Sequence, residues 1–469
     1  METSQFSQNS SGRNLEKNPI LARWSEVLRR NEAKPAIFSP DGKVLRTFND
    51  VEKEARFWAS RLGFLPPRSV VSCQIGNAPE FFSFLLACWR ADYCFLPFDL
   101  ELARNRRDDL EKVCGVTMRL EASKSGFRLV PVNGSATSLM AADMLKVTSG
   151  SAGEPKAIRF SCAQLLADCD AICETMGIRE TDINYGAIAF SHSYGFSNLV
   201  TPLLCQGVPL VAARDMLPHA LRDGLAASRA TVFPGVPAVF RTLGAVGPGD
   251  SRPRLCISAG APLTPEIAAK FGDTWRTKIH TFYGASECGG ICYDVSEDYV
   301  IEPGFVGQPL SGVALDLAEE GEPSQATVIS KAVGKGYHPA RVGESFGGQY
   351  TPGDLLEKGS DGYRICGRVS DFINVAGRKV NPSEIEQVIV SLPQVESAVI
   401  IGLPAGARGE EIAACYVGGA EIDDLRKGCA RALPSWQVPR HWLKLEELPV
   451  NHRGKISRAD LRRKLLAGG

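Results

Sequence analysis

The sequence contains no run of about 18 apolar residues and no excess of charge of either sign. Its 469 residues include 53 Lys+Arg and 53 Asp+Glu. Balanced charge gives no reason to expect nucleic acid or an anionic membrane surface as a partner, and we expect no membrane span. The first residues, METSQFSQNSSGRN, lack the basic and apolar regions of a secretory signal. We therefore expect a cytoplasmic protein.

Histidine is scarce, and the cysteines do not follow a ligand-like pattern. There are 6 histidines and 14 cysteines, with C-x-x-x-C spacings at 169/173 and 288/292 but no C-x-x-C pair. Many cysteines lie inside apolar segments such as LLACWRADYCF. This distribution favours reduced, mostly buried thiols over a zinc site or a disulfide framework.

Positive charge gathers near the end of the chain, where residues 431–469 hold nine Lys and Arg against three acids. Such a stretch can meet an anionic ligand, or it can be a solvated helix face. For Arg458, Arg462, Arg463 and Lys464 we favour the solvated face.

The order of apolar segments predicts an α/β fold. The segments 70–75, 79–91 and 93–98 read as strand, helix and strand. The alternation resumes after residue 161, where 185–190 reads as another strand, and this order is typical of a mostly parallel sheet. We expect a large N-terminal domain (1–369) of mixed and parallel sheets flanked by helices, with a β-rich lobe beyond residue 300. A small α+β domain (370–469) follows, joined by a hinge.

The segment VTSGSAGEPK (147–156) suits neither a helix nor a strand, because hydroxyl side chains and glycines crowd ahead of Pro155 and Lys156. Glycines let backbone N–H groups face an anion, and a lysine compensates its charge, so a phosphate cradle is one interpretation. A solvated loop is the other, since the segment does not fit the pattern G-x-x-x-x-G-K-[ST]. By itself the segment leaves both open.

Several motifs in a fixed order, from about residue 36 to 460, resemble the adenylate-forming superfamily. This superfamily includes acyl- and aryl-CoA ligases, carrier-protein adenylation domains and firefly luciferase. The motifs are VTSGSAGEPK, SAGAP (258–262), FYGASE (282–287), YTPGD (350–354), GRVSD (367–371) and LPVNHRGKISRADL (448–461). An ordered set is far more specific than any one motif.

The resemblance implies an ATP site. It implies that the outer phosphates are wrapped by Thr148, Ser149, Gly150, Ser151, Gly153 and Lys156. It implies that adenine passes Ala259, Gly260, Ala261 and Pro262, beside the motif residues Tyr283, Gly284 and Ser286. Glu287 would hold Mg²⁺ against the phosphates. Asp354 and Arg368 would contact the ribose.

The resemblance also implies the catalytic residues. Lys455 would bridge the substrate carboxylate and the α-phosphate, stabilising charge in the transition state. His192 would wall the carboxylate and gate the thiol, and Ser370 would be the hinge, with Gly377 on a loop used in the second step. Candidate walls of the acyl pocket are Tyr194, Gly195, Phe196, Val236 and Gly289, together with Ala259 and Gly284.

The implied reaction is an ATP-dependent ligation of an acyl or aryl acid through acyl-AMP to a thioester with coenzyme A or a carrier-protein phosphopantetheine. Ser193 and Tyr194 stand where amino-acid-activating relatives have an Asp, so an α-amino acid is not expected. Ala152, Ala157, Pro352 and Ser370 depart from the family pattern. Two alternatives therefore stay open: a catalytically degenerate nucleotide- or acyl-adenylate-binding protein, and an enzyme that stops at acyl-AMP or acylates another acceptor.

Overall fold

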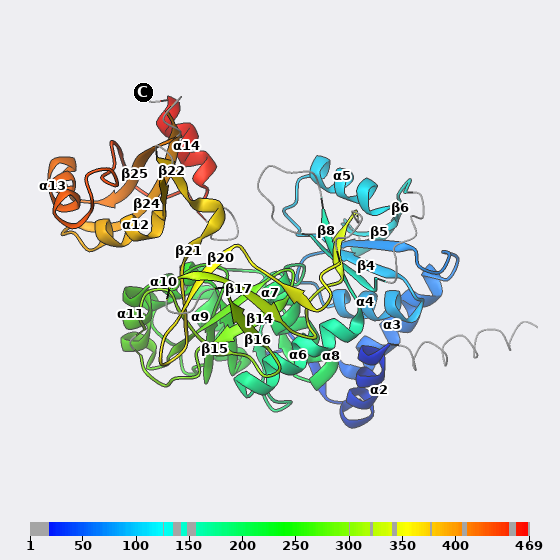
Figure 1. Ribbon diagram of the computed structural model, residues 1–469. Coiled ribbons are helices and arrows are strands. Elements are labelled where there is room, and N and C mark those ends of the chain that lie inside the picture. Colours follow the sequence, from blue (N-terminus) through cyan, green and yellow to red (C-terminus); the bar gives the residue numbers. More distant parts are fainter. Residues whose placement is uncertain are drawn as a thin grey trace, which may run out of the picture. The chain divides into compact units, whose positions relative to one another are not determined.

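The computed structural model describes residues 18–124, 126–134, 142–147, 156–299, 301–318, 322–339, 345–375, 378–405, 410–449 and 456–467 (Figure 1). The chain forms two compact units. One comprises Met1–Asp316 with Val328–Tyr350, and the other comprises Leu317–Thr327 with Thr351–Gly469. The boundary expected between residues 369 and 370 is the position of a hinge between two domains, and it stays a prediction.

The first unit contains a long sheet with strand order β15-β14-β13-β12-β11-β9-β10-β1-β2. The pairs from β13 through β12, β11, β9 and β10 to β1 are parallel, whereas β14, β15 and β2 pair antiparallel. The strands are β1 (Pro35–Phe38), β2 (Val44–Thr47), β9 (Asn184–Tyr185), β10 (Leu210–Val211), β11 (Val232–Gly235), β12 (Leu255–Ser258), β13 (Ile279–Ala285), β14 (Gly289–Tyr293) and β15 (Phe305–Pro309).

A second sheet of the same unit has the order β18-β8-β7-β4-β3-β5-β6. Its centre, β7-β4-β3-β5, is parallel, and its margins are antiparallel. The strands are β3 (Val70–Gln74), β4 (Cys94–Pro97), β5 (Val116–Ser123), β6 (Gly126–Pro131), β7 (Met144–Val147), β8 (Ala157–Phe160) and β18 (Gly336–His338). The predicted mixed and parallel sheets are confirmed.

Helices cover these sheets, and their ends follow local capping chemistry. The helix α3 begins with a capping box between Thr47 and Asp50, and α6 ends at Gly177 in the left-handed conformation. The helices are α2 (Pro19–Asn31), α3 (Phe48–Leu62), α4 (Glu80–Arg90), α5 (Arg104–Cys114), α6 (Cys162–Met176), α7 (Ser193–Gly195), η1 (Phe196–Val200), α8 (Thr201–Gln206), α9 (Pro218–Ser228), α10 (Pro237–Val246) and α11 (Pro265–Trp275).

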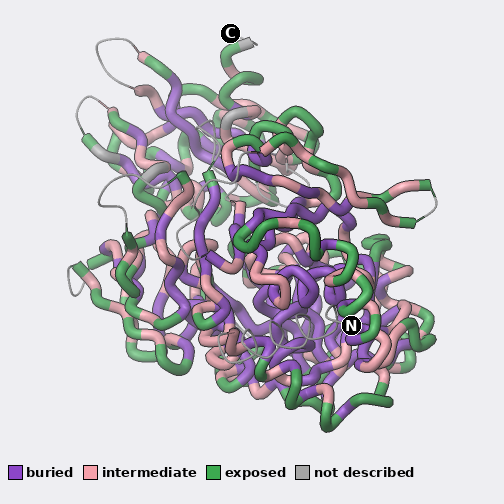
Figure 2. The backbone as a smooth tube through the Cα atoms, turned by 90° about the vertical axis from the view of Figure 1, so that its right-hand side faces the viewer, coloured by how far each residue is buried: buried purple, intermediate pink, exposed green. Residues whose placement is uncertain are grey.

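The core of the first unit is rich in aromatic side chains. Phe81 packs edge-on against Phe95 and Phe190, with ring centroids 5.5 and 5.6 Å apart. Figure 2 shows buried residues gathered toward the interior and exposed residues mainly around the outside. No helix among the described residues is long and apolar enough to cross a membrane.

The second unit is an α+β arrangement. Its strands β24 and β25 pair antiparallel and β25 and β26 pair parallel, and α12 and α14 pack on β24. The elements in or bordering this unit are β16 (Ala314–Leu317), β17 (Ser324–Ile329), β19 (Gln349–Tyr350), β20 (Asp354–Lys358), β21 (Tyr363–Arg368), η2 (Val369–Asp371), β22 (Ile373–Val375), β23 (Arg378–Val380), α12 (Pro382–Val390), β24 (Val395–Pro404), β25 (Glu410–Gly418), α13 (Ile422–Ala432), β26 (His441–Leu445) and α14 (Arg458–Ala467).

One predicted strand is wrong for most of its length. The segment 185–190 reads as a strand from its sequence, but β9 ends at Tyr185. The side chain of Asn77 takes the place of a neighbouring strand: its amide donates to the carbonyls of Gly186 and Ile188 and accepts from the N–H of Phe190. A side chain thus satisfies backbone groups that a sheet ladder would otherwise pair.

Candidate functional site

Adjacent parallel strands end together at one edge of the long sheet. Gly235 at the end of β11 is in register with Ser258 at the end of β12, and the N–H of Ala259 donates to the carbonyl of Gly235. Gly260 has φ +85°, and a Cβ added there would lie 3.8 Å from Val236 Cγ1. The structure therefore brings the predicted adenine segment beside Val236, at the strand ends where α/β sheets hold ligands.

Two buried hydroxyl groups at this edge have no hydrogen-bond partner among the described residues. They are Ser258 Oγ and Thr281 Oγ1, and the two residues face each other on β12 and β13. Buried hydroxyl groups are normally paired. These two hydroxyl groups are therefore available beside the predicted adenine segment.

The structure brings Lys156 and Glu287 together through a residue that the sequence analysis missed. The Tyr337 hydroxyl donates to Glu287 Oε1 at 2.9 Å, and Lys156 Nζ lies 4.0 Å from the centre of the Tyr337 ring. Lys156 precedes β8, Glu287 lies in the turn between β13 and β14, and Tyr337 is on β18. One tyrosine thus contacts the predicted phosphate-binding lysine and the predicted magnesium carboxylate.

Neighbouring aromatic residues hold Tyr337 in place. Its hydroxyl lies 3.1 Å from that of Tyr350, and the ring of Phe346 packs against both tyrosines. Burial, the hydrogen bond with Tyr350 and the charge of Glu287 all raise the pKa of Tyr337. Tyr337 therefore stays protonated and remains a hydrogen-bond donor to the Glu287 carboxylate.

We predict that Tyr337→Phe lowers acyl-AMP formation about tenfold or more, because a hydrogen bond to a charged group contributes about 1.5–3 kcal/mol. The variant keeps the aromatic ring that faces Lys156, so the decrease in rate measures the contribution of the hydroxyl group alone. Initial rates of hydroxylamine-trapped product measure it. Tyr299→Phe, at a half-exposed tyrosine, is the matched control. An unchanged rate in Tyr337→Phe would show that the hydroxyl does not position Glu287.

His192 is paired with a carboxylate that the sequence analysis also missed. His192 Nε2 lies 2.6 Å from Asp99 Oδ2, and the two residues are 93 positions apart in the chain. Asp99 follows β4, and His192 is the N-terminal cap of α7. Only the folded structure shows this pairing, since no motif links the two segments.

A buried polar cluster lies behind the predicted acyl-pocket residue Gly289. Asp168 Oδ1 accepts the N–H of Gly290 at 2.8 Å, and Asp168 Oδ2 accepts the hydroxyl of Ser197. Lys146 on β7 is 2% exposed and lies 4.7 Å from the ring of Phe160. Burial lowers the pKa of Lys146, while the charge of Asp168 opposes that change. The sequence analysis did not predict this cluster, because a single lysine between apolar residues in a strand forms no recognisable motif.

Gly289→Ala is expected to lower the thermal midpoint of unfolding by several degrees. Gly289 has φ +73°, and an added Cβ would lie 2.3 Å from Asp168 Oδ1. The left-handed backbone alone costs alanine about 1–2 kcal/mol. Gly177→Ala is the control, because Gly177 has φ +61° and open space around it. Equal shifts in the two variants would contradict a contribution from the Asp168 contact.

Three further predicted acyl-pocket residues, Tyr194, Gly195 and Phe196, lie on α7 and at the start of η1. The Tyr194 hydroxyl donates to the carbonyl of Ile257 at 2.9 Å, and its ring lies 5.8 Å from that of Phe282. Phe196 is fully buried, with Lys146 Nζ 5.3 Å from its ring. An added Cβ on Gly195 would lie 2.1 Å from the carbonyl oxygen of Ala189. Their contact with substrate stays a prediction.

The two predicted ribose-binding residues are neighbours in the second unit. Asp354 on β20 and Arg368 on β21 face each other, and Arg368 Nε lies 3.1 Å from Asp354 Oδ1. Ser370 lies in the short helix η2. The predicted residues Thr148, Ser149, Gly150, Ser151, Gly153, Gly377 and Lys455 lie outside the described residues.

The residues present fit a magnesium ion that is shared with phosphates. Within the described part of the chain, no group of three or more His, Cys, Asp or Glu side chains could hold a metal ion by itself. Glu287 offers one carboxylate, whose Oε1 accepts a hydrogen bond from Tyr337. Mg²⁺ prefers one or two carboxylates together with phosphate oxygens. Glu287 would therefore hold the ion only with a nucleotide present.

Comparisons with known proteins identify the family of the chain. The AMP-binding enzyme model matches residues 141–337, and the AMP-binding enzyme C-terminal domain model matches 384–455. The chain is 30% identical to anthranilate–CoA ligase of Pseudomonas aeruginosa over 346 residues, 69% of this chain and 66% of that one. It is 25% identical to 3,4-dihydroxybenzoate–[aryl-carrier protein] ligase of Bacillus anthracis, over 67% of this chain and 72% of that one.

A solved structure shows the same fold. ATP-bound MatB from Rhodopseudomonas palustris matches with a TM-score of 0.81 and 22% identity, covering 94% of this chain and 98% of that one. The family models and the ligase relatives support an AMP-forming ligase. The chain belongs to the AMP-binding enzyme family, within the adenylate-forming superfamily.

Proposed function

We propose that this protein joins the carboxylate of an aryl acid or a modest acyl acid to the AMP moiety of ATP. The acyl group of this acyl-AMP is then transferred to a thiol. The observation that carries the proposal is the contact of Tyr337 with both Glu287 and Lys156. It places one cationic and one anionic side chain from separate motifs around a single tyrosine. Relatives named as ligases of anthranilate and 3,4-dihydroxybenzoate support an aryl acid.

In the first step the ionised carboxylate attacks the α-phosphorus of ATP and pyrophosphate leaves. The attack needs no protein nucleophile, so the side chains act by positioning and by charge. Lys156 would hold the outer phosphates, Asp354 and Arg368 the ribose, and Lys455 the substrate carboxylate and α-phosphate. Mg²⁺ bound at Glu287 would neutralise charge on the phosphates.

In the second step a thiol displaces AMP. We propose that residues 370–469 rotate about Ser370 between the steps, since hinges absorb backbone rotation at a few positions. The acceptor is coenzyme A or the phosphopantetheine of a carrier protein. The basic stretch over residues 431–469 suits the phosphates of coenzyme A and an acidic carrier equally well.

Hydroxylamine trapping tests the proposed function. Benzoate, anthranilate, 3,4-dihydroxybenzoate and hexanoate are each incubated with the protein, ATP and Mg²⁺, and the hydroxamate is measured. Thioester and AMP are then followed with coenzyme A and with pantetheine. We expect hydroxamate from at least one aryl acid. Hydroxamate from none of the acids would favour a non-catalytic binding protein and overturn the proposal.

A further inference from the structure

The paired side chains of His192 and Asp99 come from distant parts of the first unit. Their atoms Nε2 and Oδ2 are 2.6 Å apart, and the side chains are 26% and 12% exposed. The backbone fixes His192 as well, because its N–H donates to the carbonyl of Ala189 and its carbonyl accepts the N–H of Phe196. His192 is therefore held through both its imidazole ring and its main chain.

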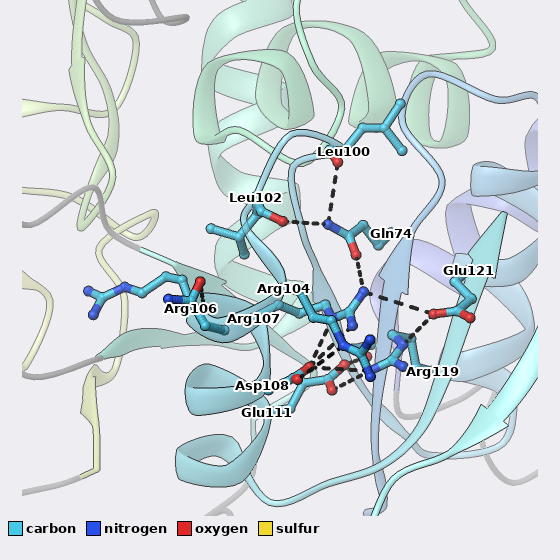
Figure 3. Close-up of polar contacts among 12 residues, drawn as sticks. Gln74, Leu100, Leu102, Arg104, Arg106, Arg107, Asp108, Glu111, Arg119 and Glu121 are labelled. Atoms are coloured by element: carbon cyan, nitrogen blue, oxygen red, sulfur yellow. Dashed lines mark hydrogen bonds and ion pairs between the residues drawn. The ribbon is translucent and has the colours of Figure 1, made fainter.

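The loop that carries Asp99 is anchored by a buried polar network. Gln74 Nε2 donates to the carbonyls of Asp99 and Leu102 at 2.9 and 3.2 Å. Arg107 Nη1 in turn donates to Gln74 Oε1 at 2.7 Å. Figure 3 shows Gln74 between the loop carbonyls and Arg107, with the ion pairs of Arg119 below them. The main chain at Asp99 is thus held by side chains from β3 and α5.

This pairing fixes which nitrogen of the neutral His192 ring keeps its lone pair. The carboxylate of Asp99 accepts the Nε2 proton, which leaves the lone pair of Nδ1 to accept another. In the part of the chain that the structure describes, Asp99 is the ionisable group recorded in contact with this imidazole. A histidine oriented by a carboxylate is the arrangement of a general base.

The two steps of the proposed reaction differ in their need for a base. A carboxylic acid with a pKa near 4 is already ionised at neutral pH, so adenylation requires no proton removal. A free thiol has a pKa of about 8.5, and its thiolate is the nucleophile. A base in this enzyme therefore acts in thioester formation.

We infer that His192 is the base for the attacking thiol and that Asp99 is its positioning residue, an inference that rests on the proposed function. His192 Nδ1 accepts the thiol proton, and the sulfur attacks the acyl carbonyl carbon of acyl-AMP. The C–S bond forms as the C–O bond to the phosphate breaks, and AMP leaves with that electron pair. Asp99 stabilises the imidazolium until the proton passes to solvent.

The experiment compares the two steps in the same preparations. For the acid that gives the most hydroxamate, hydroxamate formation without thiol is measured beside thioester formation with coenzyme A and with pantetheine. In Asp99→Asn and His192→Ala, we expect the ratio of thioester to hydroxamate rates at pH 7 to fall about 10²-fold or more. The controls Asp273→Asn and His219→Ala change exposed residues and are expected to keep the wild-type ratio.

The pH profile separates a base from a merely structural pair. The thiol ionises by itself as pH approaches 8.5, so the deficit of Asp99→Asn is expected to shrink about tenfold or more between pH 7 and pH 9. A wild-type ratio of thioester to hydroxamate rates in Asp99→Asn, or a decrease in that ratio that is constant with pH, would overturn the inference. Neither outcome would contradict the proposed ligase function. Absence of hydroxamate in the wild type would instead contradict the proposed function.

Discussion

Replacing Lys455 with alanine is expected to lower acid-dependent pyrophosphate release about 10²- to 10³-fold. The motif around Lys455 predicts that its ammonium group bridges the attacking carboxylate and the α-phosphate. Negative charge develops there as pyrophosphate leaves, and removing one such donor typically costs about 2.7–4 kcal/mol of transition-state stabilisation. A coupled pyrophosphate assay with saturating ATP and acid measures the change.

Lys464→Ala is the matched control, because Lys464 is an exposed lysine on α14 of the same unit. It should leave the rate within about twofold, as surface substitutions usually do. Synthetic acyl-AMP separates the steps further: Lys455→Ala should still convert it to thioester, since the α-phosphorus has already been attacked. Pyrophosphate release that survives in Lys455→Ala undiminished would show that the proposed mechanism is wrong.

The parallel strands were predictable because buried β-branched and aromatic runs alternate with helical patterns in the sequence. The segments 70–75 and 93–98 became β3 and β4. The failure at 186–190 has a different origin. Asn77 comes from a loop more than 100 positions earlier and satisfies this backbone with its side chain. Periodicity carries no information about such a partner.

The residues of the candidate site also fall into those that the sequence indicated and those that only the structure revealed. Lys156 and Glu287 could be named as candidates from the sequence because their motifs carry side chains whose chemistry suits phosphates and Mg²⁺, and their roles stay predictions. Tyr337 and Asp99 could not be named in this way, because each contacts a residue that is 50 or 93 positions away in the chain. The sequence indicated reactive groups, and the fold supplied the residues that orient them.

Glu287→Gln is expected to lower acyl-AMP formation at 1 mM Mg²⁺ about 10²-fold. The amide keeps the shape of the carboxylate but loses its charge, and Mg²⁺ strongly prefers anionic oxygen. The Tyr337 hydroxyl can still donate to the amide oxygen, so the contact at 2.9 Å need not be lost. The variant therefore tests the charge of Glu287 separately from its position.

A magnesium titration distinguishes this role from a structural one. In Glu287→Gln the Mg²⁺ concentration for half-maximal rate should rise about tenfold or more, since the ion keeps only phosphate and water ligands there. Tyr337→Phe retains the charge, so we expect a smaller shift of the titration. Glu174→Gln, at an exposed acid near the end of α6, should not shift it. A wild-type Mg²⁺ dependence in Glu287→Gln would show that Glu287 does not bind the ion, because loss of a direct carboxylate ligand must weaken Mg²⁺ binding.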